Sequence, residues 1–170
     1  MAEPVYEWFQ QGMALLRSGD SHAAATVLER AVAAEPDKTS VREALARAYY
    51  GAERFDDALE QFLTVLEMSP VNDYAIFGTG LCLGRLGRLD EAVGHLKMAA
   101  VMRPDNDDYV SAVRRWETRR SYRADVRQRM DAARQRRDQM REQSGEQEPA
   151  EPDFGPDPGD ELGERAGGAD

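Results

Sequence analysis

The sequence predicts an all-α protein: a solenoid of three helix-turn-helix repeats, a C-terminal capping helix and a disordered acidic tail. Shifting the sequence against itself by 34 residues aligns small and apolar positions three times over, and a proline closes each unit at Pro36, Pro70 and Pro104. Composition then changes after residue 106, first to arginine-rich and then to acidic. With 170 residues and 41% hydrophobic content, the chain can bury one modest core or a short stack of repeats.

Small and large apolar residues recur at fixed places in each unit. The repeating columns are Gly12, Ala46 and Gly80; Leu15, Tyr49 and Leu83; Ala24, Ala58 and Ala92; Leu28, Phe62 and Leu96; and Ala31, Val65 and Ala99. Small residues let the two helices of a unit approach closely, and large residues fill the space between units. Turns are expected at Gly19-Asp20, Glu53-Arg54 and Gly87-Arg88. The six helices are therefore predicted over residues 5–18, 21–34, 39–51, 55–68, 73–86 and 89–102.

These columns resemble the tetratricopeptide repeat family, whose pattern is W-x2-L-G-x2-Y, then A-x3-F, then P. The matching residues are Trp8, Gly12, Leu15, Ala24, Leu28, Ala31 and Pro36; then Leu45, Ala46, Tyr49, Ala58, Phe62 and Pro70; then Gly80, Leu83, Ala92, Leu96, Ala99 and Pro104. Arg42 and Ile76 depart from the family's Trp, and Gln11 and Thr79 depart from its Leu. The resemblance implies a right-handed α-solenoid with repeats at 5–38, 39–72 and 73–106.

A further helix follows the third unit. This capping helix, with an arginine-rich extension, is predicted over residues 107–143. Tyr109, Val113 and Trp116 fall at i, i+4 and i+7, so the face that they form is expected to pack on the third unit and cover it as a lid. Eight arginines between positions 119 and 137 crowd the rest of that helix. Residues 144–170 are rich in Pro, Gly and acid and are predicted to be disordered. The net charges of segments 1–106, 107–143 and 144–170 are −6, +4 and −8.

The chain offers little catalytic chemistry. Its two histidines, His22 and His95, do not group with Cys82 and a carboxylate at metal-ligand spacing, and no glycine loop follows a strand to hold a phosphate. Cys82 stands beside a core column and is expected to pack as a small hydrophobe. We therefore expect a non-catalytic protein with no cofactor and no metal. No apolar run of about 18 residues is present to cross a bilayer, so the expected location is the cytoplasm. Arginine almost replaces lysine, which indicates G+C-rich coding, and we expect a bacterial protein.

The resemblance implies that the first helix of each unit lines a concave groove for peptides or partner helices. The faces of these helices that the core columns leave unused give the candidate partner-binding residues: Tyr6, Phe9, Met13, Arg17, Glu43, Arg47, Tyr50, Tyr74, Phe77, Leu81 and Arg85. Seven of them are aromatic or large aliphatic, which is typical of an interaction site. The sequence predicts an adaptor that binds an apolar or amphipathic segment of another protein, unless some of these side chains belong to the core.

Family members that hold the terminal carboxylate of chaperone tails present Lys and Asn in the groove. The matching places here carry Phe9, Met13, Ala44, Tyr74 and Gly78, so a carboxylate clamp is not expected.

Two alternatives involve the C-terminal segments. The arginines of the last helix could follow a nucleic-acid backbone, although seven acidic residues share the stretch and the net charge of the whole chain is −10. The acidic tail could instead fold back across the basic helix with Phe154 as its apolar anchor. We expect a protein or peptide partner, no membrane, and a monomer or weak self-association.

Overall fold

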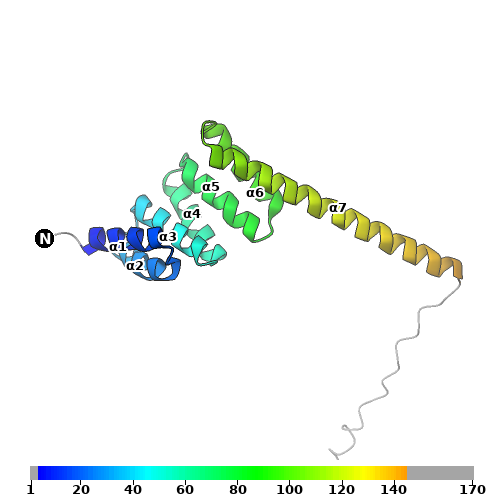
Figure 1. The fold of residues 1–170 in the computed structure, drawn as a ribbon, viewed down its shortest axis with the longest axis horizontal. Coiled ribbons are helices and arrows are strands. Elements are labelled where there is room, and N and C mark those ends of the chain that lie inside the picture. Colours follow the sequence, from blue (N-terminus) through cyan, green and yellow to red (C-terminus); the bar gives the residue numbers. More distant parts are fainter. Residues whose placement is uncertain (1–3, 145–170) are drawn as a thin grey trace, which may run out of the picture. The chain divides into compact units, whose positions relative to one another are not determined.

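The computed structural model describes residues 4–144, which form seven α-helices and no strand. In chain order these are α1 (Pro4–Ser18), α2 (Ser21–Ala34), α3 (Thr39–Gly51), α4 (Phe55–Met68), α5 (Asp73–Arg85), α6 (Leu89–Met102) and α7 (Asp107–Ser144) (Figure 1). The first six match the expected ranges to within one residue at each end. The all-α prediction is therefore confirmed, whereas the predicted disorder of the tail concerns residues outside the described part.

The described chain separates into two compact units, and the boundary lies inside α7. Residues up to Val126 belong to the first unit and residues from Arg127 onward to the second. The first unit contains α1 to α6 and the first turns of α7, so the arginine-rich segment expected as a single piece is divided between the two.

The helices of the first unit pack in consecutive pairs. α1 packs on α2, α3 on α4 and α5 on α6, while α1 also contacts α3 and α3 contacts α5. The small columns permit this packing, because a Cβ added to Gly12 would lie 2.5 Å from Leu28 Cγ, and one added to Gly80 would lie 2.8 Å from Leu96 Cγ. The odd-numbered helices therefore form a row of neighbours along one side of the stack.

The turns between paired helices recur with the same hydrogen bond. Asp20, Arg54 and Arg88 each donate a backbone N–H to a carbonyl five residues earlier, at 2.9 Å in all three turns. The residue before each donor has positive φ, which glycine adopts cheaply at positions 19 and 87 and which Glu53 adopts at 60°. The expected turns are confirmed, including the less favourable one at Glu53.

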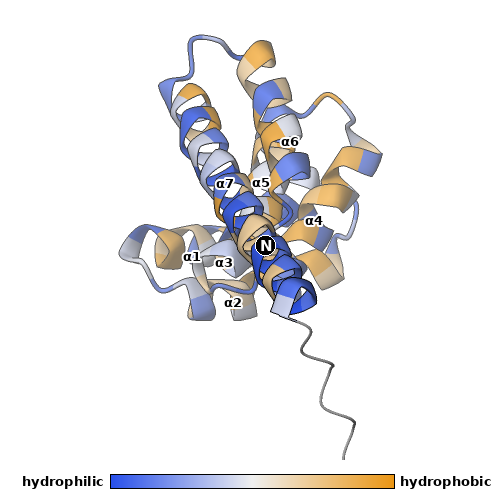
Figure 2. Ribbon diagram, turned by 90° about the vertical axis from the view of Figure 1, so that its right-hand side faces the viewer, coloured by the Kyte–Doolittle hydropathy of each residue, from blue (hydrophilic) through white to orange (hydrophobic). Residues whose placement is uncertain are grey.

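The first turns of α7 cover the third helix pair. Tyr109, Ala112 and Trp116 are buried, as the sequence predicts for a lid. The Tyr109 ring stacks on Phe77 with centroids 4.3 Å apart, and its hydroxyl donates to Asp73 Oδ2 at 3.0 Å. In the second unit no residue of 127–144 is buried, and hydrophilic colouring dominates α7 in Figure 2.

Candidate functional site

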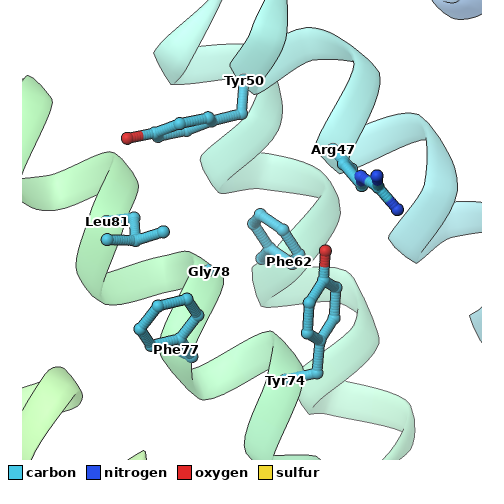
Figure 3. A pocket seen from close by; sticks show the side chains of 7 residues that line it. All are labelled: Arg47, Tyr50, Phe62, Tyr74, Phe77, Gly78 and Leu81. Carbon is cyan, nitrogen blue, oxygen red and sulfur yellow. The ribbon is translucent and has the colours of Figure 1, made fainter. Parts of the chain in front are cut away.

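A small cavity opens among α3, α4 and α5. Its volume is about 60 Å³, and it is lined by Arg47, Tyr50, Phe62, Tyr74, Phe77, Gly78 and Leu81 (Figure 3). Four of these residues come from α5, two from α3 and one from α4. The surface is therefore mostly apolar, with two hydroxyl groups and one guanidinium group at its edge.

The centre of the cavity depends on one aromatic ring and one glycine. Figure 3 shows Phe62 of α4 between Tyr50 of α3 and the Tyr74 side chain of α5. The Phe62 and Tyr74 rings meet edge to face, with centroids 6.0 Å apart and an interplanar angle of 71°. A Cβ at position 78 would run into the Phe62 ring, so Gly78 is what allows this ring to lie against α5.

The side of the cavity formed by Phe77 and Leu81 of α5 is supported by the first turns of α7. Phe77 stacks on Tyr109, and both Phe77 and Leu81 pack against buried clusters that include residues of α7. A third glycine of α5, Gly84, lies under the Trp116 ring, because an added Cβ there would be 2.7 Å from ring carbons. The capping contact of α7 thus fixes the side chains that shape this wall.

The rim of the cavity carries positive charge. Arg47 is exposed, and the Arg85 guanidinium lies 5.0 Å from the Phe55 ring centre and 5.9 Å from that of Tyr50. Burial raises the pKa of Tyr50 and of Tyr74, while Arg85 and Arg47 partly oppose this rise. Both hydroxyls therefore stay protonated at neutral pH and can donate to a carbonyl or carboxylate oxygen.

The cavity brings together part of the candidate set. Arg47, Tyr50, Tyr74, Phe77 and Leu81 line it, and Arg85 adjoins it through the Tyr50 ring. Glu43 does not line it, and its carboxylate accepts a hydrogen bond from Asn72 Nδ2 at 2.6 Å.

The four candidates on α1 do not line this cavity. Phe9 and Met13 are half-buried and pack against core clusters, which is the core alternative left open by the sequence. Tyr6 and Arg17 are exposed.

Sequence reasoning missed two of the lining residues, Phe62 and Gly78. Phe62 stands in a core column and is only 3% exposed, so its position indicated packing alone. Gly78 is one of four glycines in the span 78–87, and it stands outside the repeating columns. One sequence pattern could have indicated both residues: a large aromatic residue on one predicted helix, Phe62, and a glycine that leaves room for its ring on the next helix, Gly78.

The metal-ligating and thiol groups of the described chain lie outside the cavity. Residues 4–144 hold no cluster of three His, Cys, Asp or Glu side chains that could bind a metal. Cys82 is fully buried, as predicted, and burial raises its pKa to about 12. No helix within residues 4–144 is long and apolar enough to span a membrane.

Several arginines at the start of the basic stretch make contacts within the first unit. Arg123 donates to the Gly87 carbonyl at 3.2 Å, Arg120 lies 3.8 Å from an Asp90 carboxylate oxygen, and Arg119 lies over the Trp116 ring. The contacts of Arg120 and Arg123 therefore help to hold the first turns of α7 against the third helix pair.

Comparison with known proteins assigns the repeats. Two models described as tetratricopeptide repeat match residues 7–48 and 43–107, which together span more than half of the chain. Superkiller complex protein 3 of Mus musculus and that of Homo sapiens are each 28% identical over 109 residues, or 64% of this chain. The chain spans only about 7% of the length of these relatives.

Solved structures agree with this assignment. The first tetratricopeptide repeat domain of Spaghetti (RPAP3), bound to the HSP90 peptide SRMEEVD, aligns with a TM-score of 0.65 at 16% identity, covering 71% of this chain and 96% of that one. At this identity the likeness concerns the fold alone. A structure of MamA aligns with a TM-score of 0.60 at 29% identity, covering 69% of this chain and 67% of that one.

Proposed function

Because the chain belongs to the tetratricopeptide repeat family, we propose that it is a non-catalytic adaptor whose cavity among α3, α4 and α5 binds a segment of a partner protein. The segment carries an apolar side chain that enters the cavity, and polar or acidic neighbours that meet the rim. Structures of RPAP3 domains with HSP90 and HSP70 peptides support the general mode, since they place peptides on the same fold.

The observation that carries the proposal is the composition of the cavity. Aromatic and aliphatic side chains form its surface, while Arg47 and Arg85 stand at its edge. Full burial of one apolar side chain stabilises a complex by roughly 1.5–3 kcal/mol, and the arginines favour acidic neighbours and speed association. A segment with a single apolar anchor and flanking carboxylates fits both features.

The proposed ligand differs from a terminal carboxylate. Tyr74 and Gly78 line the cavity at two of the places where clamp-bearing family members present Lys or Asn. We therefore propose recognition of an internal apolar residue in an extended or helical segment.

A displayed peptide library tests this function. Peptides are selected on the wild type and then measured against Tyr74→Ala and the double variant Arg47→Glu/Arg85→Glu. Arg30→Glu is the control, because Arg30 is an exposed arginine of α2 that does not line the cavity. Selected peptides should share an apolar residue beside acidic ones, and each cavity variant should weaken binding roughly tenfold or more, as loss of an anchor does. Unchanged binding to both cavity variants would refute the proposal.

Phe77 is left unchanged in this test, although it lines the cavity. Its ring stacks on Tyr109, so truncating it would also loosen α7 and mix a loss of stability with a loss of binding.

The nucleic-acid alternative stays a prediction, as do the cytoplasmic location and the bacterial origin. Titration of a labelled DNA duplex at increasing salt tests the first. Binding to phosphates would weaken steeply as salt rises, whereas an adaptor of the proposed kind would not bind the duplex.

A further inference from the structure

The repeat spacing continues past the third helix pair into the first turns of α7. The three buried residues of α7 each stand 34 positions after a buried residue of α5: Tyr109 after Ala75, Ala112 after Gly78, and Trp116 after Cys82. The Tyr109 ring also stacks on Phe77 of α5, while α1 contacts α3 and α3 contacts α5 elsewhere in the row. The first turns of α7 therefore add a fourth member to the row of odd-numbered helices.

The exposed side of this row carries a concentration of positive charge. Two neighbouring columns at the same spacing hold five arginines and no acidic residue: Met13, Arg47, Leu81 and Arg115 in the first, and Arg17, Gly51, Arg85 and Arg119 in the second. All five arginines are exposed. Segment 1–106, by contrast, has a net charge of −6. An acidic stack thus gathers basic side chains along one side, where they attract a ligand of negative charge.

Arg115 lies on the side of α7 that faces the cavity. Glu117 stands two positions further, which turns it to the other side of a helix of about 3.6 residues per turn, and there it pairs with Lys97 of α6 at 2.7 Å. Figure 3 shows the Tyr50 side chain extending from α3 toward α5, the neighbour of α7. Burial raises the pKa of Tyr50, and the positive charges of Arg85 and Arg115 oppose this rise. The Arg115 guanidinium is therefore close enough to the cavity rim to act on a group bound there.

Two of the five arginines have no polar partner in the stack. Arg17 and Arg85 stand in the last turns of α1 and α5, where positive charge complements the helix dipole. Arg47 and Arg115 stand inside α3 and α7, and within residues 4–144 neither side chain has an ion pair or a hydrogen bond. Arg47 lines the cavity, so Arg115 is a second arginine whose charge remains available to a ligand.

We propose that Arg115, together with Arg85, binds an acidic residue of the partner segment, so that the first turns of α7 form part of the binding surface. This inference rests on the proposed function, because the apolar residue in the cavity holds the segment in place. A guanidinium group can bind a carboxylate through two parallel hydrogen bonds. Neighbouring helices lie ~8–10 Å apart, and an extended chain advances ~3.3 Å per residue, so the acidic residue stands about three positions from the apolar one.

Charge reversal at two adjacent arginines tests the proposal. The probes are versions of one library-selected peptide that carry a single glutamate at successive positions on either side of the apolar residue. Each is titrated into the full chain and into Arg115→Glu. Arg114→Glu is the matched control, because Arg114 is the preceding residue and is also exposed, but it lines a groove between α6 and α7 with Val101 and Val113. Circular dichroism verifies that both variants keep their helices.

The effect should depend on where the glutamate stands. Arg115→Glu should weaken binding roughly tenfold when the glutamate is about three positions from the apolar residue, since attraction becomes repulsion, and Arg114→Glu should not. A lysine in place of that glutamate should restore binding to Arg115→Glu. Equal effects of the two variants, or an equal loss for every glutamate position, would overturn the proposal.

Failure of the proposed function gives a different result. In that case no peptide is selected, or selected peptides bind Tyr74→Ala as tightly as the wild type, and both proposals fall. Peptides that lose affinity for Tyr74→Ala but bind Arg115→Glu as tightly as the wild type would leave the cavity as the site and refute the role of α7.

Discussion

α5 and α7 hold equivalent places in the repeat but differ greatly in how they pack. α5 has 13 residues and buries eight of them, whereas α7 has 38 residues and buries three. The difference follows from residue size: Gly78, Gly80 and Gly84 of α5 admit large side chains from α4, α6 and α7. At the position equivalent to Gly80, α7 carries Arg114. Small residues thus decide how many neighbours a helix of this stack can accept.

The same difference locates the proposed binding site. α5 supplies four of the seven side chains around the cavity, and α7 supports two of these through Tyr109 and Trp116. The proposed binding surface therefore lies mainly on α5, a helix that packs against α3, α4, α6 and the first turns of α7. Four predictions test this contrast.

Removal of the Trp116 ring should have the largest effect. Trp116→Ala deletes the buried indole that covers Gly84, and we expect a loss of ~3–5 kcal/mol in the free energy of unfolding, measured by denaturant titration. Tyr122→Ala is the control on the same helix, since Tyr122 is 71% exposed, and should change stability by less than ~0.5 kcal/mol. Similar losses in both variants would mean that burial of the Trp116 indole does not account for the loss of stability.

Adding one methyl group to α5 should destabilise the fold, whereas adding it to α6 should not. Gly78→Ala forces Cβ into the Phe62 ring, and we expect a loss of ~1–3 kcal/mol. Gly94→Ala meets nothing within 4 Å in the interior of α6 and should stabilise the protein by ~0.5–1 kcal/mol. Thermal melts of both variants check this, and effects of the same sign would contradict the packing of α5.

The contact between α5 and α7 should weaken at alkaline pH. Burial, together with the hydrogen bond to Asp73, raises the pKa of Tyr109. The folded state then keeps a proton that the unfolded state releases above the ordinary tyrosine pKa of 10.0. Stability should therefore be intact below pH 10 and fall above it by up to ~1.4 kcal/mol per pH unit from this group. Denaturant titrations from pH 8 to 11 should show a shallower fall for Tyr109→Phe, and equal slopes would refute this linkage.

Substituting glycine at two equivalent positions, Glu53 and Ser121, should change the free energy of unfolding in opposite directions. Glu53→Gly relieves a left-handed φ of 60° between α3 and α4, and should stabilise the fold by ~1 kcal/mol or less. Ser121→Gly, at the equivalent place in continuous α7, should cost ~0.5 kcal/mol through lower helix propensity. Helix content and unfolding free energy measure both, and a stabilising Ser121→Gly would indicate that α7 tends to turn there.

Most of the fold could be predicted from the sequence, because repeat columns and turn glycines report local geometry. The six helix ranges, the turns and the Tyr109–Trp116 lid all follow from such patterns. The cavity follows less directly: it depends on how the Phe62 ring of α4 crosses Gly78 of α5, and no spacing rule gives the path of a ring between two helices. For the same reason the spacing does not show that Phe9 and Met13, two of the candidate groove residues, are partly buried against core clusters.

Nuclear magnetic resonance mapping tests the central claim most directly. A peptide selected from the library is titrated into the isotope-labelled full chain, and the backbone amide shifts of α3 and α5 are compared with those of α6 and α7. We expect saturable changes around Arg47, Tyr74 and Leu81, and their loss in Tyr74→Ala. Changes confined to the α6–α7 groove or to the arginines from Arg119 to Arg137 would contradict the assignment of the binding site.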